Sequence, residues 1–102
     1  IGYAGALSSR LNSHGEIMKF FTIDMLKKAK NCIVFLDEPE SGLSLRNQYK
    51  FIKEVQKAVK RQCQIFIATH SLPIIQSQAE VYSMEHKKWM TSDNFIKTQK
   101  EE

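Results

Sequence analysis

The chain has 102 residues, and its 15 Lys and Arg residues against 11 Asp and Glu residues give a formal net charge of +4. The hydrophobic fraction of 42% and the charged fraction of 25% are ordinary for a globular protein in water, and the length allows one domain at most. The longest apolar run, Cys32–Leu36, is far shorter than the ~20 residues that span a membrane, which excludes a membrane-spanning segment here.

A first helix is expected after a polar loop over residues 1–12. Ser13 stands three residues before Glu16, which is the spacing of a capping box, in which the two side chains satisfy free N–H groups at the helix start. We expect the helix to end near Lys30 and Asn31, where lysines complement the helix dipole. Apolar side chains recur at helical spacing in between, at Ile17, Phe20, Phe21 and Met25.

A short strand and an acidic loop are predicted next. Cys32–Leu36 is a continuous apolar run, which is typical of a parallel strand covered on both faces. The run stops at Asp37–Gly42, a segment that contains three carboxylates, one proline and one glycine. These residues cannot continue a buried strand, so we expect a loop.

A second helix and a second strand follow the loop. Ser44 is the expected N-cap of the helix. The segment Gln64–Ala68 repeats the signal of a buried strand, and Thr69–Ser71 ends it. The apolar face of the helix is predicted from helical spacing at Leu45, Tyr49, Ile52, Val55 and Val59.

The C-terminal part gives fewer signals. Pro73 favours a short helix through Gln78, and Val81–Met84 favours a third strand. Residues 85–102 are polar and basic, and we expect a partly helical basic tail. The lysine-rich faces indicate solvated surfaces first and a nucleic-acid partner only second, because no arginines alternate with aromatic side chains as in a base-stacking surface.

The order helix, strand, helix, strand predicts an α/β fold with a parallel β-α-β core. Parallel neighbouring strands end at the same edge of a sheet, and open α/β sheets bind ligands along that edge. Asp37 and Glu38 follow the first strand and His70 follows the second. We therefore expect these side chains to meet around one ligand.

In order and spacing, these segments resemble the C-terminal half of an ABC-type ATPase domain. Cys32–Pro39 resembles a Walker B strand with its trailing catalytic Glu, and Ser41–Ser44 lies where the family has its D-loop. Ile67–Ser71 resembles the switch-histidine segment, and Asn12–Glu16 lies where the signature motif is expected. The local sequences Glu-Pro-Glu and Thr-His-Ser resemble those of the soluble ATPases of the AAA_21 group more closely than those of transporter subunits.

The resemblance implies a P-loop NTPase fold and hydrolysis of ATP. Asp37 would hold the Mg²⁺ that accompanies ATP, because Mg²⁺ prefers carboxylate oxygens and water. Glu38 would deprotonate the attacking water, and His70 would donate a hydrogen bond to the γ-phosphate. Glu38 and His70 are thus the implied catalytic residues.

The resemblance also implies a second copy of the chain. Ser13, Gly15 and Glu16 would form the nucleotide-binding signature at a helix N-terminus, where free N–H groups favour phosphate. In the family this signature contacts the nucleotide of the opposite subunit. The implied assembly is a nucleotide-sandwich homodimer with two composite sites.

The phosphate-binding loop pattern G-x-x-x-x-G-K-[ST] occurs nowhere in the sequence. We therefore expect residues 1–102 to be a single partial domain, the C-terminal portion of an ABC-type ATP-binding domain. A complementing N-terminal Walker A segment would supply the loop, and the isolated chain would be inactive. The absence of this loop leaves open whether the chain is an enzyme.

Each motif has a structural interpretation as well. Asp37 and Glu38 could be a polar turn, His70 a surface histidine, and Ser13 a helix cap. The alternative function is a non-catalytic remnant that acts as a binding or interaction module. The N-terminal residues lack the basic start and long apolar stretch of a secretory signal, and the two cysteines form no disulfide framework, so we expect a cytoplasmic protein.

Overall fold

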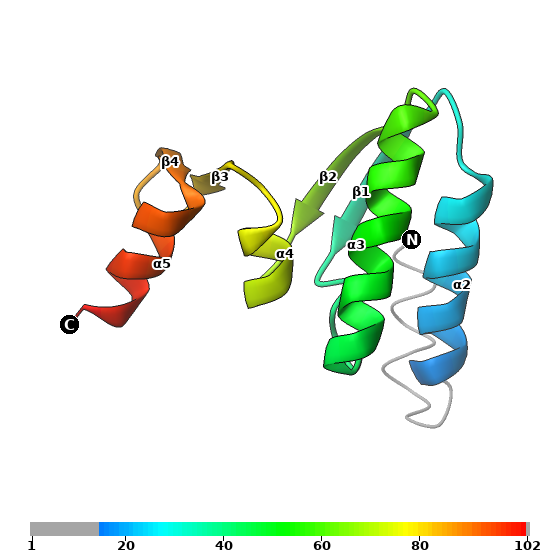
Figure 1. Cartoon of the computed structure of the whole chain (residues 1–102), viewed down its shortest axis with the longest axis horizontal. Coiled ribbons are helices and arrows are strands. Elements are labelled where there is room, and N and C mark those ends of the chain that lie inside the picture. Colours follow the sequence, from blue (N-terminus) through cyan, green and yellow to red (C-terminus); the bar gives the residue numbers. More distant parts are fainter. Residues whose placement is uncertain (1–14, 102) are drawn as a thin grey trace.

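The computed structural model describes residues 15–101, with side chains from residue 21 on. In Figure 1, α2 and α3 lie side by side next to β1 and β2, while β3, β4 and α5 form a second group at the C-terminal end. Among the described residues, none of the helices has the length and apolarity that crossing a membrane requires. The elements in chain order are α2 (Gly15–Lys28), β1 (Ile33–Asp37), α3 (Leu45–Lys60), β2 (Gln64–Ala68), α4 (Leu72–Gln76), β3 (Glu80–Ser83), β4 (Lys88–Thr91) and α5 (Ser92–Lys100).

The two strands β1 and β2 run parallel and are joined by α3. Their register places Ile33 opposite Gln64 and Asp37 opposite Ala68, so both strands end at the same edge. Branched and aromatic side chains favour this pleated arrangement. The predicted parallel β-α-β core of an α/β fold is therefore confirmed, and it is compatible with part of a P-loop NTPase fold.

The core lies between α2, α3 and the inner face of this sheet. Leu26 of α2 and Phe51 of α3 are 0% and 1% exposed, and Ile74 of α4 closes the core from the side. Burial of each such side chain stabilises the fold by about 1.5–3 kcal/mol relative to exposure.

The buried stripe of α3 differs from the one that the sequence predicts. Only two members of the predicted face, Ile52 and Val55, are buried, and the side chains that complete the stripe are Phe51 and Ala58. The remaining three predicted positions are exposed, at Leu45, Tyr49 and Val59. The stripe is rotated because α3 packs against α2 as well as against the sheet, which the periodicity of one helix does not reveal.

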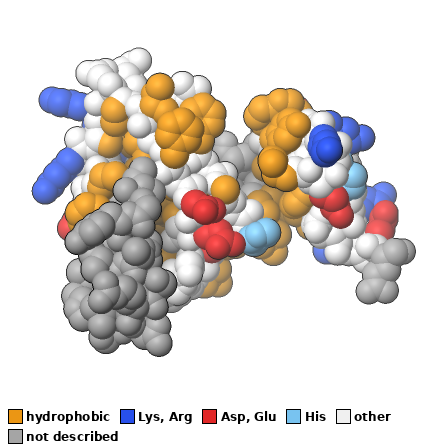
Figure 2. Space-filling model, turned by 180° about the vertical axis from the view of Figure 1, so that it is seen from behind, with side chains coloured by type: hydrophobic (Ala, Val, Ile, Leu, Met, Phe, Trp, Pro, Cys, Tyr) orange, Lys and Arg blue, Asp and Glu red, His pale blue; other side chains and the backbone are white. Residues whose placement is uncertain are grey.

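The sequence also predicts strands covered on both faces, and within the described residues only one face is covered. Ile33, Phe35 and Phe66 are exposed by 61%, 59% and 47% on the opposite face. The rings of Phe35 and Phe66 stack with centroids 5.0 Å apart. Apolar side chains gather visibly on the surface seen in Figure 2.

The C-terminal segment is more ordered than a tail. The predicted third strand is found as β3, but it pairs antiparallel with β4 and not with β1 or β2. α5 packs on this hairpin, and Tyr82 and Trp89 make an edge-to-face contact across it. Residues 85–102 thus contain both β4 and α5.

One predicted helix cap, Ser44, is confirmed by the structure. Ser44 is the N-cap of α3, and its hydroxyl accepts a hydrogen bond from the backbone N–H of Asn47 at 3.2 Å. Ser71 caps α4, which spans Leu72–Gln76 and is therefore shifted slightly from the predicted helix. Ser13, the predicted cap of α2, lies outside the described residues.

Candidate functional site

The candidate site lies where β1 and β2 end. Asp37 is the last residue of β1, and Glu38 follows it. The backbone N–H of Glu38 donates a hydrogen bond to the carbonyl of Ala68, the last residue of β2, at 2.7 Å. This bond extends the parallel ladder by one step and holds the residues after each strand next to each other.

Glu38 and His70 contact each other across this edge. Glu38 Oε1 lies 3.5 Å from His70 Nε2, and the side chains are 56% and 88% exposed. Figure 2 shows acidic side chains and a histidine side by side on this surface. A side-chain contact so exposed adds little stability. The expected meeting of the two side chains is thus found, and both remain accessible to a ligand.

The backbone of Glu38 is strained. Its φ of 49° lies in the left-handed region, which is uncommon for a residue with a long side chain. Two turn bonds follow, from the N–H of Ser41 to the carbonyl of Glu38 at 3.1 Å and from the N–H of Leu43 to the carbonyl of Glu40 at 2.8 Å. Strain of this kind is concentrated at functional positions in proteins.

Glu40, which was not a predicted site residue, connects the two loops. Its Oε1 accepts a hydrogen bond from the Thr69 hydroxyl at 2.6 Å, and its Oε2 accepts one from the backbone N–H of His70 at 2.9 Å. Burial alone would raise the pKa of this carboxyl, but these hydrogen bonds outweigh it and the pKa lies below its usual value. Glu40 therefore fixes the backbone that carries the His70 imidazole.

Further hydrogen bonds tie this segment to α3 and α4. The Ser71 hydroxyl donates to Gln48 Oε1 at 2.6 Å, and the Ser71 N–H donates to Thr69 Oγ1 at 2.9 Å. Gln48 Nε2 in turn donates to the carbonyl of Leu43 at 3.2 Å. The loop after β1 and the loop after β2 are thus linked through side chains as well as through the sheet.

The predicted metal residue stands alone. Asp37 is exposed at the end of β1. Within residues 15–101, no group of three or more His, Cys, Asp or Glu side chains is placed to hold a metal ion. A single carboxylate still suits Mg²⁺ in a nucleotide site, because this ion keeps several waters and takes further oxygens from phosphate.

The predicted signature residues lie at or before the start of α2. Gly15 and Glu16 form the start of α2, but the structure describes side chains only from residue 21 on. Ser13 lies outside the described residues altogether. Their role as nucleotide contacts therefore stays a prediction.

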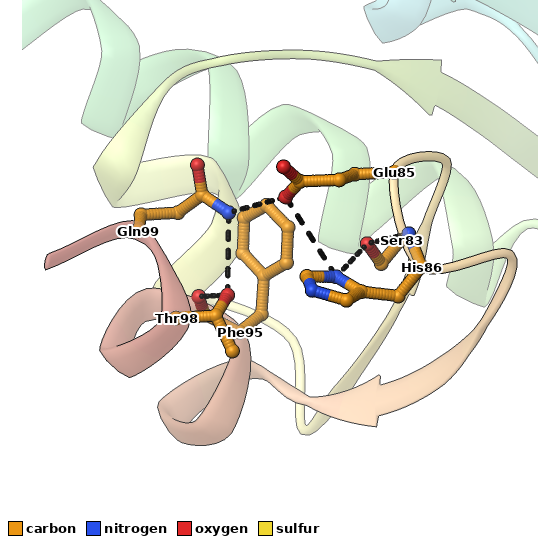
Figure 3. A network of polar contacts seen from close by, with 6 residues as sticks. All are labelled: Ser83, Glu85, His86, Phe95, Thr98 and Gln99. Atoms are coloured by element: carbon orange, nitrogen blue, oxygen red, sulfur yellow. Dashed lines mark hydrogen bonds and ion pairs between the residues drawn. The ribbon is translucent and has the colours of Figure 1, made fainter. Parts of the chain in front are cut away.

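A second polar cluster lies at the turn between β3 and β4 (Figure 3). Ser83 Oγ lies 2.9 Å from His86 Nδ1, and a Glu85 oxygen lies 3.7 Å from the same nitrogen. A nucleophilic relay needs the hydroxyl and the carboxylate on opposite ring nitrogens. Ser83 is also only 1% exposed, and Glu85 accepts a hydrogen bond from Gln99 of α5 at 3.2 Å. The cluster therefore ties the hairpin to α5 and is no active site.

A parallel β-α-β unit with an acidic strand end beside a histidine is compatible with part of a P-loop ATPase-type domain. The model of the family described as AAA ATPase domain matches residues 16–75, which is more than half of the chain. The chain belongs to this family. The match extends from α2 into α4 and supports an ATPase-type domain without specifying the ABC type or the AAA_21 group. Searches of curated proteins and of solved structures found no match.

Proposed function

We propose that this chain contributes the water-activating and γ-phosphate-sensing residues of an ABC-type ATP-hydrolysing site. The observation that carries the proposal is the 3.5 Å contact between Glu38 Oε1 and His70 Nε2 at the common end of two parallel strands. Open α/β sheets bind their ligands at this edge. Membership of the AAA ATPase domain family supports ATP as the ligand.

Glu38 is the proposed general base. Its exposed carboxylate can accept a proton from a water molecule as the water oxygen attacks the γ-phosphorus. Its backbone N–H donates a hydrogen bond to the carbonyl of Ala68, and its φ is left-handed. This fixed backbone supports a catalytic role, because strained residues are concentrated at functional sites.

His70 is the proposed sensor of the γ-phosphate. Its Nε2–H would donate a hydrogen bond to a terminal phosphate oxygen, and its 88% exposed side chain leaves room for that contact. Glu40 is the proposed positioning residue, because it holds the backbone N–H of His70 and the hydroxyl of Thr69. It acts through His70 and does not touch the nucleotide itself.

Asp37 is the proposed carboxylate for the Mg²⁺ bound with ATP. Its position one residue before Glu38 supports this role, because the metal and the attacking water both act on the γ-phosphate. When bound, Mg²⁺ neutralises charge on the phosphate oxygens.

The proposed site needs a phosphate-binding loop that the sequence does not contain. We infer that a complementing Walker A segment supplies it and that the chain alone is inactive. The uncovered face around Phe35 and Phe66 supports such a partner, because P-loop sheets are covered on both faces. A second copy would contribute Ser13, Gly15 and Glu16 in a nucleotide-sandwich homodimer.

The function is tested by phosphate release from ATP in the assembly of this chain with its phosphate-binding loop. We expect Glu38→Gln to lower the turnover at least ~100-fold while ATP binding is retained, because the amide cannot accept the proton. Glu80→Gln, an exposed change on β3, is the matched control and should hydrolyse ATP at the parental rate. Hydrolysis by Glu38→Gln at the parental rate would disprove the assignment.

A non-catalytic interaction module is the alternative function. The observation that favours it is the same stacked and exposed Phe35–Phe66 pair, which suits a protein contact without any chemistry. An assembly that binds no ATP, with parental and variant chains alike, would favour this alternative over the enzyme.

A further inference from the structure

A pair of thiols lies at the opposite end of the same two strands from the candidate site. Cys32 directly precedes β1, and Cys63 directly precedes β2. Their sulfur atoms are 3.7 Å apart, and both cysteines are free. The proposed ATPase chemistry does not use either thiol.

The backbone on both sides of the pair is fixed by hydrogen bonds. The N–H of Gln64 donates to the carbonyl of Cys32 at 3.0 Å, and the N–H of Asn31 donates to the carbonyl of Arg61 at 3.0 Å. Neighbouring strands lie ~4.8 Å apart, which is within the range of about 4.4–6.8 Å that the α-carbons of a disulfide adopt. The two sulfurs therefore need only side-chain rotation to reach bonding distance.

The local conformation is the same before each cysteine. Asn31 and Gln62 both have left-handed backbones, with φ of 51° and 70°. Each turns the chain from a helix end into a strand start, and this repeated geometry places the two thiols next to each other in the register. A shallow open depression lined by Asn31, Ile33 and Gln64 gives small molecules access to Cys32, which is exposed.

We propose that Cys32 and Cys63 form a reversible intramolecular disulfide when the chain meets a peroxide. The Cys32 sulfur attacks a peroxide oxygen, the O–O bond breaks, and a sulfenic acid and water or an alcohol result. The Cys63 thiol then attacks the Cys32 sulfur, loses its proton, and displaces the sulfenic oxygen as water. Overall two thiols lose two electrons and two protons, and the peroxide is reduced.

The buried position of Cys63 assigns the order of the two steps. Cys63 is 6% exposed whereas Cys32 is exposed, so Cys32 meets the oxidant and Cys63 resolves the intermediate. The hydrogen bond with Cys63 raises the pKa of the Cys32 thiol, with burial as a further cause, so the pair rests in the dithiol form at neutral pH. A dithiol reductant restores this form.

The bond would link the starts of the strands that carry Glu38 and His70 at their ends. It closes a loop that contains β1 and α3, and linking residues across such a loop restricts the unfolded chain. We expect the oxidised chain to unfold at a midpoint temperature roughly 10 °C above that of the reduced chain.

The test treats the folded chain with hydrogen peroxide and then maps the cysteines by mass spectrometry of its peptides. We expect a Cys32–Cys63 peptide pair in monomeric protein, its loss after treatment with dithiothreitol, and the rise in unfolding temperature. In Cys63→Ser we expect a sulfenic acid at Cys32 that dimedone traps, and in Cys32→Ser, an exposed change that leaves the core intact, Cys63 should remain a thiol.

Three outcomes would overturn the proposal. In the first, the wild-type chain keeps both thiols at the same peroxide concentration that yields a dimedone-trapped sulfenic acid in Cys63→Ser. Its cysteines could link only between two chains. Cys63 in the Cys32→Ser chain could also oxidise as fast as Cys32 does in the wild type.

Discussion

At the scale of single residues, Glu40 does the most to hold the candidate site together. Both of its carboxylate oxygens accept hydrogen bonds from the segment after β2, one from a side chain and one from the backbone. Hydrogen bonds to a charged acceptor contribute about 1.5–3 kcal/mol each. Glu40 therefore stabilises the fold and fixes the His70 backbone through the same contacts.

Replacing Glu40 by Gln should lower the free energy of unfolding at pH 7 by about 1–3 kcal/mol. The amide keeps one acceptor, but its NH₂ group then faces a donor, either the Thr69 hydroxyl or the His70 N–H. Urea unfolding measures this change, with Glu80→Gln as the exposed control.

The difference in unfolding free energy between the wild type and Glu40→Gln should become smaller as the pH falls. Because the pKa of Glu40 is depressed in the folded chain, the unfolded chain binds the proton first as the pH falls below the ordinary value of 4.5. The stability that Glu40 contributes is thus present at neutral pH and is lost as the pH falls through the folded pKa. If the wild type and Glu40→Gln differ equally at pH 7 and at pH 3, the ionised Glu40 makes no such contribution.

The sequence predicts part of the site at this scale. Glu38 and His70 could be predicted to meet because each follows an apolar strand, and parallel strands end at one edge. Glu40 could not, because its role depends on how the loop turns after Glu38. A third carboxylate in the acidic loop and a threonine directly before His70 were the available signals.

At the scale of elements, Arg61 joins the two helices that enclose the core. It is the C-cap of α3, and its Nε and Nη2 donate to the carbonyls of Ala29 and Leu26 at 2.9 Å and 2.6 Å. These carbonyls lie at the end of α2, where a positive charge also complements the helix dipole. One side chain thus caps α2 from the end of α3.

Arg61→Lys should destabilise the chain by about 1–3 kcal/mol, because a lysine cannot bridge two carbonyls with a planar fork. Arg46→Lys is the matched control, since Arg46 is exposed near the start of α3. Both variants are compared by thermal or urea unfolding. An equal and small effect of the two changes would show that the bridge between α2 and α3 contributes nothing.

Elements whose signals lie within a short stretch of sequence could be predicted, whereas features that depend on packing against another element could not. The apolar runs of β1 and β2 and the Ser44 cap are local signals, and the strands and the cap were predicted from them. The buried face of α3 was predicted only in part because α2 helps to decide which side chains are buried, and periodicity cannot identify that partner. β4 has only four residues, Lys88–Thr91, which are too few to show a firm period.

At the scale of the whole molecule, the two faces of the parallel sheet have different surroundings. One face packs on the helices, whereas the other exposes a stacked aromatic pair near the edge with Glu38 and His70 (Figure 2). The family match ends within α4, so the hairpin and α5 lie beyond it. An ATPase site completed by another segment would account for both the exposed face and the missing phosphate-binding loop.

The edge formed by Glu38 and His70 is proposed to receive the γ-phosphate of ATP. The most direct test is a ¹H–¹⁵N NMR titration with Mg-ATP of the labelled chain assembled with its phosphate-binding loop, with Mg-AMP as the control that lacks the terminal phosphates. We expect ATP, and not AMP, to shift the His70 ring signals and the backbone amide signals of Glu38, Glu40 and Ser41. Unchanged signals at these positions, or equal shifts with both nucleotides, would contradict the claim.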